Sequence, residues 1–453
     1  MAFNHLRRGR YHNSNSNTTL QITHEYSDPT PPTPNVRPSA PRLSPILIGF
    51  DSGLGAVHYD PHRSERPLDN LSVMTTGSSG KGKTALVKTL IWELRERGRN
   101  LLVLDLKNDF AGDAPFVSRA SLRCQYISFD GLPYNPLIPT PTRHPRTGEP
   151  VIMIAQHVAG VAAVLKTAYR LGDQQEAAVK QAIRDCLSAR GLATSGTMPF
   201  DESLEFPDFN DVGVMLDASN PSARRRLDPL FDLEIFRDEF RQTPFERLLH
   251  TSLVIHLSDI PSEHVKNALA QIVVLSAHNF YNAQTHTTDI RQYFVFDEAH
   301  RVLNSSFLAA FVRECRAYGV GIILSSQYPS DFPREVSGCM ATKIIHGNDR
   351  NEEQVRQIVA LLGCQGDEEQ VGGLDMFQAL VSNTHHLNTF IHTLAYPQLM
   401  VYRFLQEHGA GTAQQLEAIE GLDRSRLPYL LTYLTNGGLI EEVSGQFRLI
   451  RPV

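Results

Sequence analysis

The sequence is short of paired cysteines and of long apolar runs. Its 453 residues include five cysteines, none in a C-x-x-C pair, which argues against a disulfide framework or zinc site and favours a reducing compartment. No apolar run approaches the roughly 20 residues that a membrane-spanning helix needs. The N-terminus also lacks the apolar segment of a secretion signal. We therefore expect a cytoplasmic protein that makes no membrane contact.

The chain also lacks an excess of positive charge. Its 43 Lys and Arg residues against 49 Asp and Glu residues give a net charge of −6. Proteins that simply coat DNA are usually basic, so any nucleic acid must be contacted through a local surface such as a pore or a groove. Hydrophobic residues make up 41% and charged residues 20% of the chain, as is typical of a soluble globular protein.

A glycine-rich stretch, GSSGKGKT over residues 77–84, fits the pattern G-x-x-x-x-G-K-[ST]. It follows a short apolar run, NLSVMTTG, and precedes a helical pattern, KTALVKTLIWELRERG. The next run, NLLVLDLKNDF, is continuously apolar up to Asp105, which is typical of a parallel strand buried on both faces. Strand, turn, helix and strand form a βαβ unit, so the stretch has the context of a phosphate-binding loop rather than of an ordinary glycine-rich turn.

The loop residues have distinct expected roles. Backbone N–H groups and the N-terminus of the following helix are expected to hold phosphate oxygens. Lys83 is expected to reach the β- and γ-phosphates, and the Thr84 hydroxyl to bind Mg²⁺. Lys81 either touches phosphate or faces solvent. The residues expected to bind ATP are Gly77, Ser78, Ser79, Gly80, Lys81, Gly82, Lys83, Thr84 and Ala85.

A second apolar run, in YFVFDEAH, predicts a buried strand followed by two acidic residues, Asp297 and Glu298. Asp297 is expected to hold Mg²⁺, and Glu298 to polarise the attacking water as a general base. The alternative, a salt bridge at a strand end, is disfavoured by the phosphate loop upstream. The letters D-E-A-H also occur in two-lobed helicases, but too little chain follows Asp297 to build a second lobe beside the C-terminal part. We therefore interpret His300 as a local structural residue.

The segment FVRECRAYGVGIILSSQYPSDFP after this box resembles the HerA/FtsK superfamily of ring ATPases, which includes DNA pumps, conjugative coupling proteins and type IV secretion ATPases. The shared features are helix arginines, a glycine turn, an apolar strand ending in Ser-Gln, and then YPS. The hairpin ILIGFD…AVHYD, the strand LVLDLKNDF and YNPL at 134–137 are also similar. The resemblance implies an α/β fold with a RecA-like P-loop core and a mainly parallel sheet. The N-terminal barrel and transmembrane helices of the family are missing.

The resemblance also implies three catalytic roles. Gln327 would sense the γ-phosphate, although a strand-end amide that satisfies backbone groups is the alternative. Arg316 would be an arginine finger that acts on the neighbouring subunit's phosphates, with Arg313 as its rival. Either arginine is alternatively a surface residue. A finger that acts between subunits requires a ring, and the family implies a hexamer.

Composition divides the chain into five parts. We expect a helix over about Ser262–Tyr281 and another near 304–318 within the second half of the core. Three short helices and a hairpin near the C-terminus resemble a winged helix, with an apolar stripe on the third helix at Leu427, Leu430, Leu431 and Leu434. The parts are a disordered tail over 1–43, the first part of the P-loop core over 44–140, a helical insertion over 141–245, the second part of the core over 246–400 and the winged helix over 401–453.

Surfaces for nucleic acid remain open at this stage. KNDF at 107–110 and SARRRLD at 222–228 are candidates for contacting a DNA backbone, since phosphate contacts need only Lys or Arg. Arg224–Arg226 equally fit a solvated face or a subunit contact. Residues 404–453 carry six acidic and four basic residues, a poor balance for gripping DNA. Docking of a protein and reading of DNA therefore stay equally open for this part.

The function predicted from the sequence is an ATP-hydrolysing ring motor that translocates or processes DNA, with ATP and Mg²⁺ as cofactors. A second hypothesis keeps the ATPase and gives it a protein partner, such as a nuclease, which the winged helix recruits or remodels. A third is a DNA-binding regulator that binds ATP without hydrolysing it. Glu298 argues against this third hypothesis, because a site that does not hydrolyse ATP needs no general base.

Overall fold

The computed structural model describes residues 42–303 and 305–450. The expected disordered tail lies outside these residues except at its end, where Leu43 is already buried and its backbone N–H donates to His62. No helix in the described part of the chain is long and apolar enough to cross a membrane. All five cysteines lie within it as free thiols.

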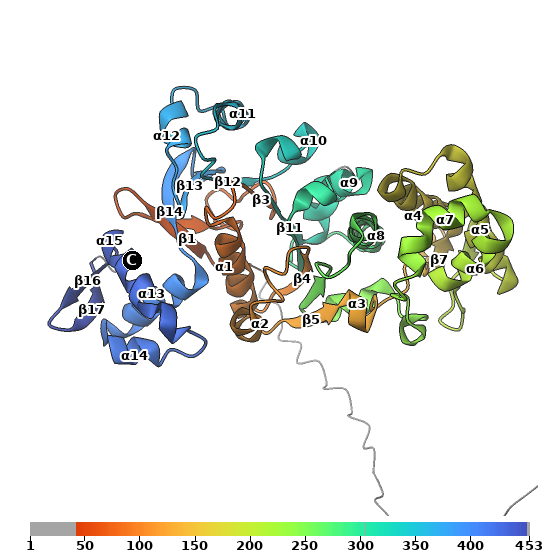
Figure 1. Ribbon diagram of the computed structural model, residues 1–453, viewed down its shortest axis with the longest axis horizontal. Coiled ribbons are helices and arrows are strands. Elements are labelled where there is room, and N and C mark those ends of the chain that lie inside the picture. The colour runs from red at the N-terminus through yellow and green to blue at the C-terminus, as the bar shows by residue number, and fades with distance from the viewer. Residues whose placement is uncertain (1–41, 304, 451–453) are drawn as a thin grey trace, which may run out of the picture. The chain divides into compact units, whose positions relative to one another are not determined.

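One large sheet organises the described residues, in the order β2-β1-β14-β13-β12-β3-β11-β10-β4-β9-β5 (Figure 1). The strands from β12 to β5 run parallel to one another, while β2, β1, β14 and β13 pair antiparallel. The bounds are β1 (Ile46–Asp51), β2 (Ala56–Tyr59), β3 (Val73–Thr76), β4 (Asn100–Asp105), β5 (Arg123–Tyr126), β9 (Leu253–His256), β10 (Gln292–Phe296), β11 (Val320–Ser326), β12 (Thr342–His346), β13 (Gln378–Ser382) and β14 (Thr389–Thr393).

The central strands are buried on both faces, which explains their continuous apolar runs. In β4, Leu101 and Val103 pack on the side of helix α1, while Leu102 and Leu104 pack on the side of helix α8. The other helices of the core continue these two layers or cover the far strands. Their bounds are α1 (Lys83–Glu96), α2 (Ala114–Arg119), α3 (Ile127–Asp130), α8 (Glu263–Asn282), α9 (Ser306–Glu314), α10 (Arg334–Ser337), α11 (Glu352–Leu362) and α12 (Glu368–Gly372).

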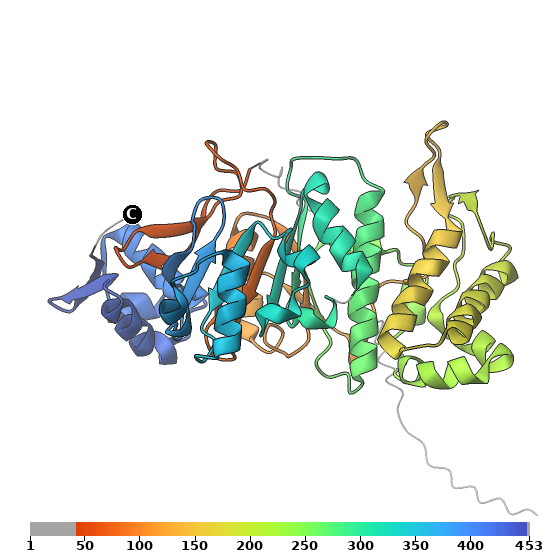
Figure 2. The same ribbon diagram turned by 90° about the horizontal axis from the view of Figure 1, so that it is seen from above.

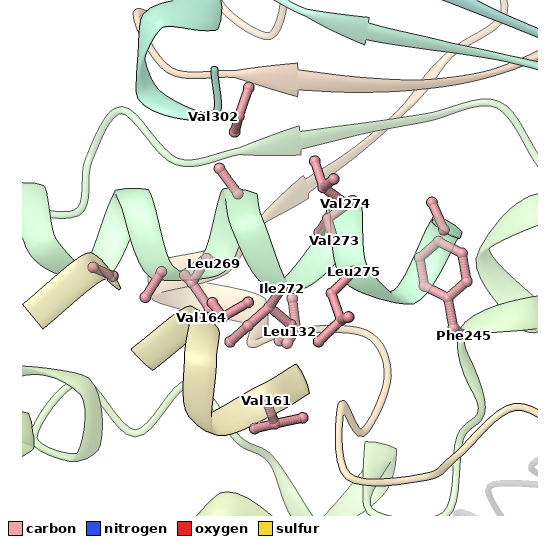
Figure 3. Close-up of a cluster of buried hydrophobic side chains, with 14 of the residues drawn as sticks. Leu132, Val161, Val164, Phe245, Leu269, Ile272, Val273, Val274, Leu275 and Val302 are labelled. Carbon is pink, nitrogen blue, oxygen red and sulfur yellow. The ribbon is translucent and has the colours of Figure 1, made fainter. Parts of the chain in front are cut away.

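The segment between β5 and β9 is mostly helical and packs on the core through α4, which lies beside α8 (Figure 2). Val161 and Val164 of α4 face Leu269 and Ile272 of α8 in an apolar cluster (Figure 3). Gly160 lets the helices approach, because a Cβ there would lie 3.1 Å from Leu275. The elements are β6 (Thr142–Arg143), β7 (Pro150–Met153), α4 (Ile154–Tyr169), α5 (Asp173–Ala189), β8 (Thr197–Pro199), α6 (Phe209–Ser219) and α7 (Pro221–Phe231).

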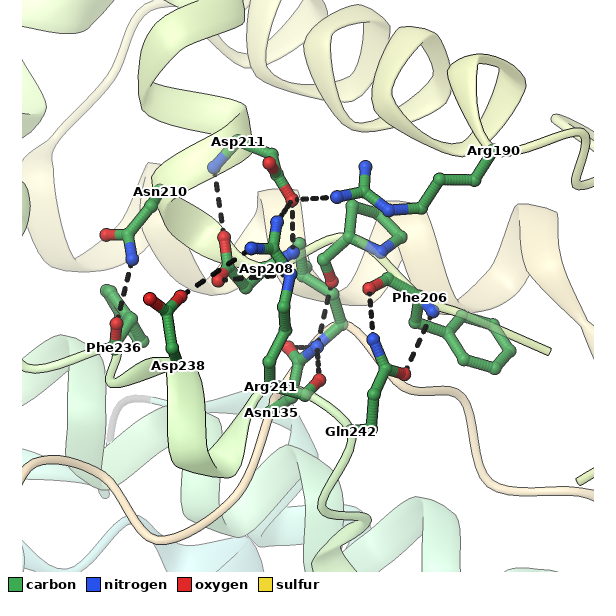
Figure 4. Close-up of polar contacts among 12 residues, drawn as sticks. Asn135, Arg190, Phe206, Asp208, Asn210, Asp211, Phe236, Asp238, Arg241 and Gln242 are labelled. Atoms are coloured by element: carbon green, nitrogen blue, oxygen red, sulfur yellow. Dashed lines mark hydrogen bonds and ion pairs between the residues drawn. The ribbon is translucent and has the colours of Figure 1, made fainter. Parts of the chain in front are cut away.

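A buried polar cluster fixes the far side of this segment (Figure 4). The Asn135 amide donates to the backbone oxygens of Pro207 and Arg241 at 2.8 and 2.7 Å, and its own oxygen accepts from the Leu137 N–H at 2.9 Å. Asp211 accepts from the guanidinium groups of Arg190 and Arg241. The YNPL segment is therefore a structural anchor, since its asparagine satisfies backbone groups that would otherwise be buried without partners.

The C-terminal part contains three α-helices and a three-stranded antiparallel sheet in the order β15-β17-β16. The four leucines of the expected apolar stripe are all buried. Arg403 pairs with the fully buried Glu93 of α1 at 2.6 Å, which joins this part to the core. The elements are α13 (Tyr396–His408), β15 (Ala410–Thr412), α14 (Ala413–Glu417), the 3₁₀ turn η6 (Arg424–Arg426), α15 (Leu427–Asn436), β16 (Ile440–Val443) and β17 (Gln446–Leu449).

Candidate functional site

The phosphate loop connects the carboxyl end of β3 to the N-terminus of α1 (Figure 1). Two of its glycines are required by geometry. Gly77 has a φ of +144°, and a Cβ there would lie 2.7 Å from the Cβ of His346. Gly82 has a φ of +104° and lies against the Phe377 ring, which a Cβ would approach to 2.9 Å. A side chain at either position would clash with these neighbours, so the shape of the loop requires glycine at both.

Backbone hydrogen bonds tie the loop to three neighbouring segments. The Gly77 N–H donates to the Gln327 carbonyl at 3.3 Å, and the Ser78 N–H donates to the Gly347 carbonyl at 2.7 Å. The Lys81 carbonyl accepts from the Phe377 N–H at 3.1 Å. These bonds hold the loop between the carboxyl ends of the parallel strands, where open α/β sheets bind their ligands.

Lys83 points back into its own loop. Its Nζ donates to the Ser78 carbonyl at 2.9 Å, and burial lowers the pKa of its ammonium. The residue is 8% exposed, so the charge lies inside the site rather than in solvent. An ammonium held this way is placed to exchange a carbonyl for phosphate oxygens when a nucleotide enters.

Lys81 was left open between phosphate and solvent, and the structure gives it carboxylate partners. Its Nζ lies 3.1 Å from Asp349 and 3.7 Å from Asp375. The Asp349 carboxylate also interacts with Ser78, and hydrogen bonds from Ser78 and Lys81 lower its pKa. Lys81 therefore clamps the phosphate loop to the segments that follow β12 and precede β13.

Asp297 follows β10 at the carboxyl edge of the sheet and is 3% exposed. Burial, reinforced by the charges of Asp109 and Glu298, raises the pKa of its carboxyl to about 7. Its Oδ2 has no hydrogen-bond partner among the described residues. A buried carboxylate oxygen without a partner is costly unless a proton, a metal ion or a bound water satisfies it.

Glu298 is buried and adopts a left-handed backbone conformation with a φ of +56°. Lys107 forms an ion pair with its Oε1, and the Nδ1 of His300 lies 3.4 Å from its Oε2. Both carboxylate oxygens therefore face a partner that is itself about two-fifths exposed, with Lys107 at 41% and His300 at 43%.

The loop after β4 belongs to this site, which the sequence reasoning missed. The buried Asp105 carboxylate accepts four backbone N–H groups, those of Lys107, Asp109, Phe110 and Ala111. This fixes Lys107 against Glu298. KNDF, interpreted from the sequence as a possible DNA contact, is thus directed into the nucleotide site. The signal in the sequence was Asp105 at the end of an apolar strand. Because the carboxyl ends of parallel strands meet at one edge of a sheet, the loop after Asp105 could have been placed in the same site as Asp297.

Asp109 adds a further carboxylate near the catalytic residues. Its charge acts on both Lys83 and Asp297. No other side chain of the described residues forms a hydrogen bond or ion pair with its carboxylate. It is therefore available to a ligand entering beside the phosphate loop.

Gln327 ends β11 at the same edge of the sheet and is half-buried, with its carbonyl bonded to the phosphate loop. Arg313 and Arg316 lie elsewhere. After Glu298, at the carboxyl end of β10, the chain returns through α9 to the amino end of the parallel strand β11. Both arginines lie just before β11, so they are at the opposite edge of the sheet from Glu298. Both are exposed, and neither forms an ion pair within the described part of the chain. Neither arginine reaches the phosphate-loop site of its own chain.

The Arg224–Arg226 segment lies on α7, in the helical part between β5 and β9. Arg224 forms ion pairs with Asp217 and Asp228, and its guanidinium stacks 4.5 Å from the Phe231 ring centroid. It is therefore engaged within its own helix pair. The two other arginines of the run are exposed.

The residues present fit a magnesium ion that a nucleotide helps to hold. The described residues contain no group of three or more His, Cys, Asp or Glu that would cage a metal on its own. Magnesium at phosphate sites usually takes one or two protein oxygens together with phosphates and waters. The unpartnered Asp297 oxygen and the Thr84 hydroxyl supply that set.

A parallel sheet, a phosphate loop and an acidic neighbouring strand end together are the features of the P-loop NTPase class. Protein-family models and curated proteins give no match to the sequence. Among solved structures, VirB4 of Thermoanaerobacter pseudethanolicus is similar with a TM-score of 0.59 and 17% identity, over 78% of this chain and 96% of that one. The bacterial conjugative coupling protein TrwBdeltaN70 is similar with a TM-score of 0.52 and 13% identity, over 78% of this chain and 90% of that one.

These likenesses show the fold. The α/β P-loop fold predicted from the sequence is confirmed, and the chain is similar in fold to VirB4 and to the coupling protein TrwB.

Proposed function

We propose that the chain is an ATP-hydrolysing ring motor that moves DNA. The observation that carries the proposal is the placement of Glu298, a buried carboxylate beside Asp297 and across from Lys83 at the carboxyl edge of the sheet. Lys83 and the loop N–H groups bind the β- and γ-phosphates. Glu298 takes a proton from the water that attacks the γ-phosphorus, and ADP leaves.

A bound Mg²⁺ would supply positive charge that offsets the negative charge of the phosphates. Asp297 and Thr84 would hold it. The Gln327 amide would donate to a γ-phosphate oxygen, and the bond between its carbonyl and the Gly77 N–H connects the end of β11 to the phosphate loop. These residues bind and orient the nucleotide, while the proton of the water goes to Glu298.

The position of the arginines supports a ring. Arg313 and Arg316 are exposed at the edge of the sheet opposite their own site. A surface guanidinium at that edge is available to the open nucleotide site of a second copy, where it stabilises the charge that develops on the phosphates. Each copy then uses one edge to bind ATP and the other to complete its neighbour's site. Six copies would close the ring in the HerA/FtsK arrangement.

DNA is proposed as the substrate because HerA/FtsK motors, which the sequence resembles, move DNA through the pore of a ring. VirB4 and TrwB share the fold, and TrwB is described as a conjugative coupling protein. The acidic net charge is consistent with contacts that are confined to such a pore.

The competing proposal gives the ATPase a protein partner, such as a nuclease, recruited by the C-terminal part. Its element order of helix, strand, two helices and hairpin supports the winged helix expected from the sequence, and its acidic balance favours a protein over a nucleic acid. A regulator that binds ATP without turnover is disfavoured by the buried Glu298.

The test measures ATP turnover with and without duplex DNA, together with the mass of the particle in ATP. The motor predicts turnover that rises several-fold with DNA in a particle of several copies. DNA-independent turnover would favour the protein-partner proposal, and Lys83→Ala is the control that abolishes nucleotide binding in either case.

A further inference from the structure

Phe377, directly before β13, has a backbone φ of +60°. Glycine adopts this left-handed conformation readily, whereas a bulky side chain is strained there. Three hydrogen bonds keep Phe377 in place. Its N–H donates to the Lys81 carbonyl at 3.1 Å, and its own carbonyl accepts from the N–H and the hydroxyl of Thr393 at 2.7 and 3.0 Å. Strain that neighbouring contacts maintain in this way is a feature of functional positions.

The Phe377 ring lies against the phosphate loop. A Cβ on Gly82 would lie 2.9 Å from the Cδ1 of the ring, so the ring and the loop backbone are in direct contact. Asp375, two residues before Phe377, lies 3.7 Å from the Nζ of Lys81. Residues 375–377 therefore contact both loop residues that immediately precede Lys83.

Helix α15 of the C-terminal part contacts this same segment. The ring of Tyr433 meets the Phe377 ring edge to face, with centroids 5.3 Å apart and an interplanar angle of 74°. One turn earlier, the Tyr429 hydroxyl donates to the Met376 sulfur at 3.9 Å. The Tyr433 hydroxyl has no hydrogen-bond partner among the described residues, so its contact with the core is made by the ring. A continuous set of contacts thus leads from α15 through Phe377 to the phosphate loop.

We propose that Phe377 is a positioning residue for the nucleotide site and that Tyr433 supports it, so that the C-terminal part sets the geometry of the phosphate loop. The inference rests on the proposed function, because it requires a nucleotide at that loop. Both residues act through Gly82 and Lys81. A loop that is already held in its binding conformation loses less conformational freedom when the nucleotide binds. A ligand of the C-terminal part that shifts α15 changes the affinity for nucleotide, and nucleotide changes the affinity for that ligand by the same factor.

The first experiment removes the Phe377 ring and keeps its backbone. Glycine adopts a φ of +60° without strain and retains the N–H and the carbonyl, so Phe377→Gly tests the ring alone. The KM for ATP and the dissociation constant for ADP should rise about tenfold, because a loosened loop must be ordered by the nucleotide. The kcat should change less than about twofold, because the loop binds substrate and transition state alike. A merely structural role would instead reduce the folded fraction, and hence kcat, with KM unchanged.

The second experiment tests the link to the C-terminal part. Tyr433→Ala should raise the KM for ATP about threefold to tenfold, the range expected for one aromatic pair, and Tyr433→Phe should restore the wild-type value. In a Phe377→Gly background, Tyr433→Ala should raise KM no further, because Tyr433 acts through that ring. Phe404→Ala is the matched control, since this ring packs on His408 and Gly411 within the C-terminal part. Thermal unfolding checks that each variant is folded.

An unchanged KM in Phe377→Gly would overturn the inference, as would an equal rise in Phe404→Ala. If Tyr433→Ala raises KM as much in the Phe377→Gly background as in wild type, the link through Phe377 is wrong. Failure of the proposed function looks different, because wild type would then hydrolyse no ATP and would match Lys83→Ala.

Discussion

Lys107 forms an ion pair with Glu298, joining the loop after β4 to the proposed catalytic base after β10. The lysine is 41% exposed while the glutamate side chain is 7% exposed, so a solvated cation holds a buried carboxylate. Asp105 keeps the lysine in place by accepting four backbone N–H groups of its loop. The ion pair therefore fixes the position of the Glu298 carboxylate at the end of β10.

The first prediction concerns Lys107. Lys107→Met should lower kcat at least tenfold with little change in KM, because the Glu298 carboxylate would lose the ion pair that holds it in position for the attacking water. Lys107→Arg should keep most of the activity. A Lys107→Met rate equal to wild type would show that the pair is not needed for turnover.

The second prediction concerns the pH dependence of magnesium binding. Burial raises the pKa of Asp297 to about 7, so the carboxyl is increasingly neutral as the pH falls from 8 to 6. A metal ligand must be ionised, hence the affinity for Mg²⁺ with nucleotide should fall by up to about tenfold per pH unit below 7. Calorimetry at several pH values measures this. Asp297→Asn should bind weakly and without that slope, and a wild-type affinity independent of pH contradicts the assignment.

The third prediction concerns the anchor of the helical segment. Asn135→Ala leaves two carbonyls and one N–H buried without their partner, so it should lower the free energy of unfolding by about 1–3 kcal/mol. Asn210→Ala is the control, because that exposed asparagine donates one bond, to the Phe236 carbonyl. Denaturant unfolding measures the free energy of unfolding of both variants. Equal stabilities would show that Asn135 makes a dispensable contact and is not an anchor.

The sequence predicts the parts of the site that form from adjacent residues. The pattern of the phosphate loop is contained in eight adjacent residues. Asp297 and Glu298 directly follow an apolar run, which by itself predicts a strand. Helix α8 was expected over Ser262–Tyr281 and occupies Glu263–Asn282. The helix expected near 304–318 is shorter, because α9 ends at Glu314 and a 3₁₀ turn leads to Gly319, whose φ is +67°.

Contacts between distant segments could not be predicted. The partners of Lys81 lie in the segment after β12 and in the one before β13, and the pairing of Lys107 with Glu298 depends on β4 lying next to β10 in the sheet. Strand order follows from tertiary packing, which no local pattern in one sequence reports. KNDF was therefore interpreted as a candidate contact to a DNA backbone, whereas Asp105 fixes its backbone and Lys107 pairs with Glu298.

The central claim, that each site is completed by an arginine of the neighbouring copy, is tested by mixing two inactive variants. Glu298→Gln lacks the base but keeps the arginine, and Arg316→Ala keeps the base but lacks the arginine. Arg313→Ala is assayed in the same way to identify the finger. Each variant alone should be at least a hundredfold slower than wild type. Randomly mixed rings should regain up to about a quarter of the wild-type rate, because that share of interfaces combines an intact base with an intact arginine. A mixture as inactive as its components, with rings shown by mass to contain both variants, would contradict the claim.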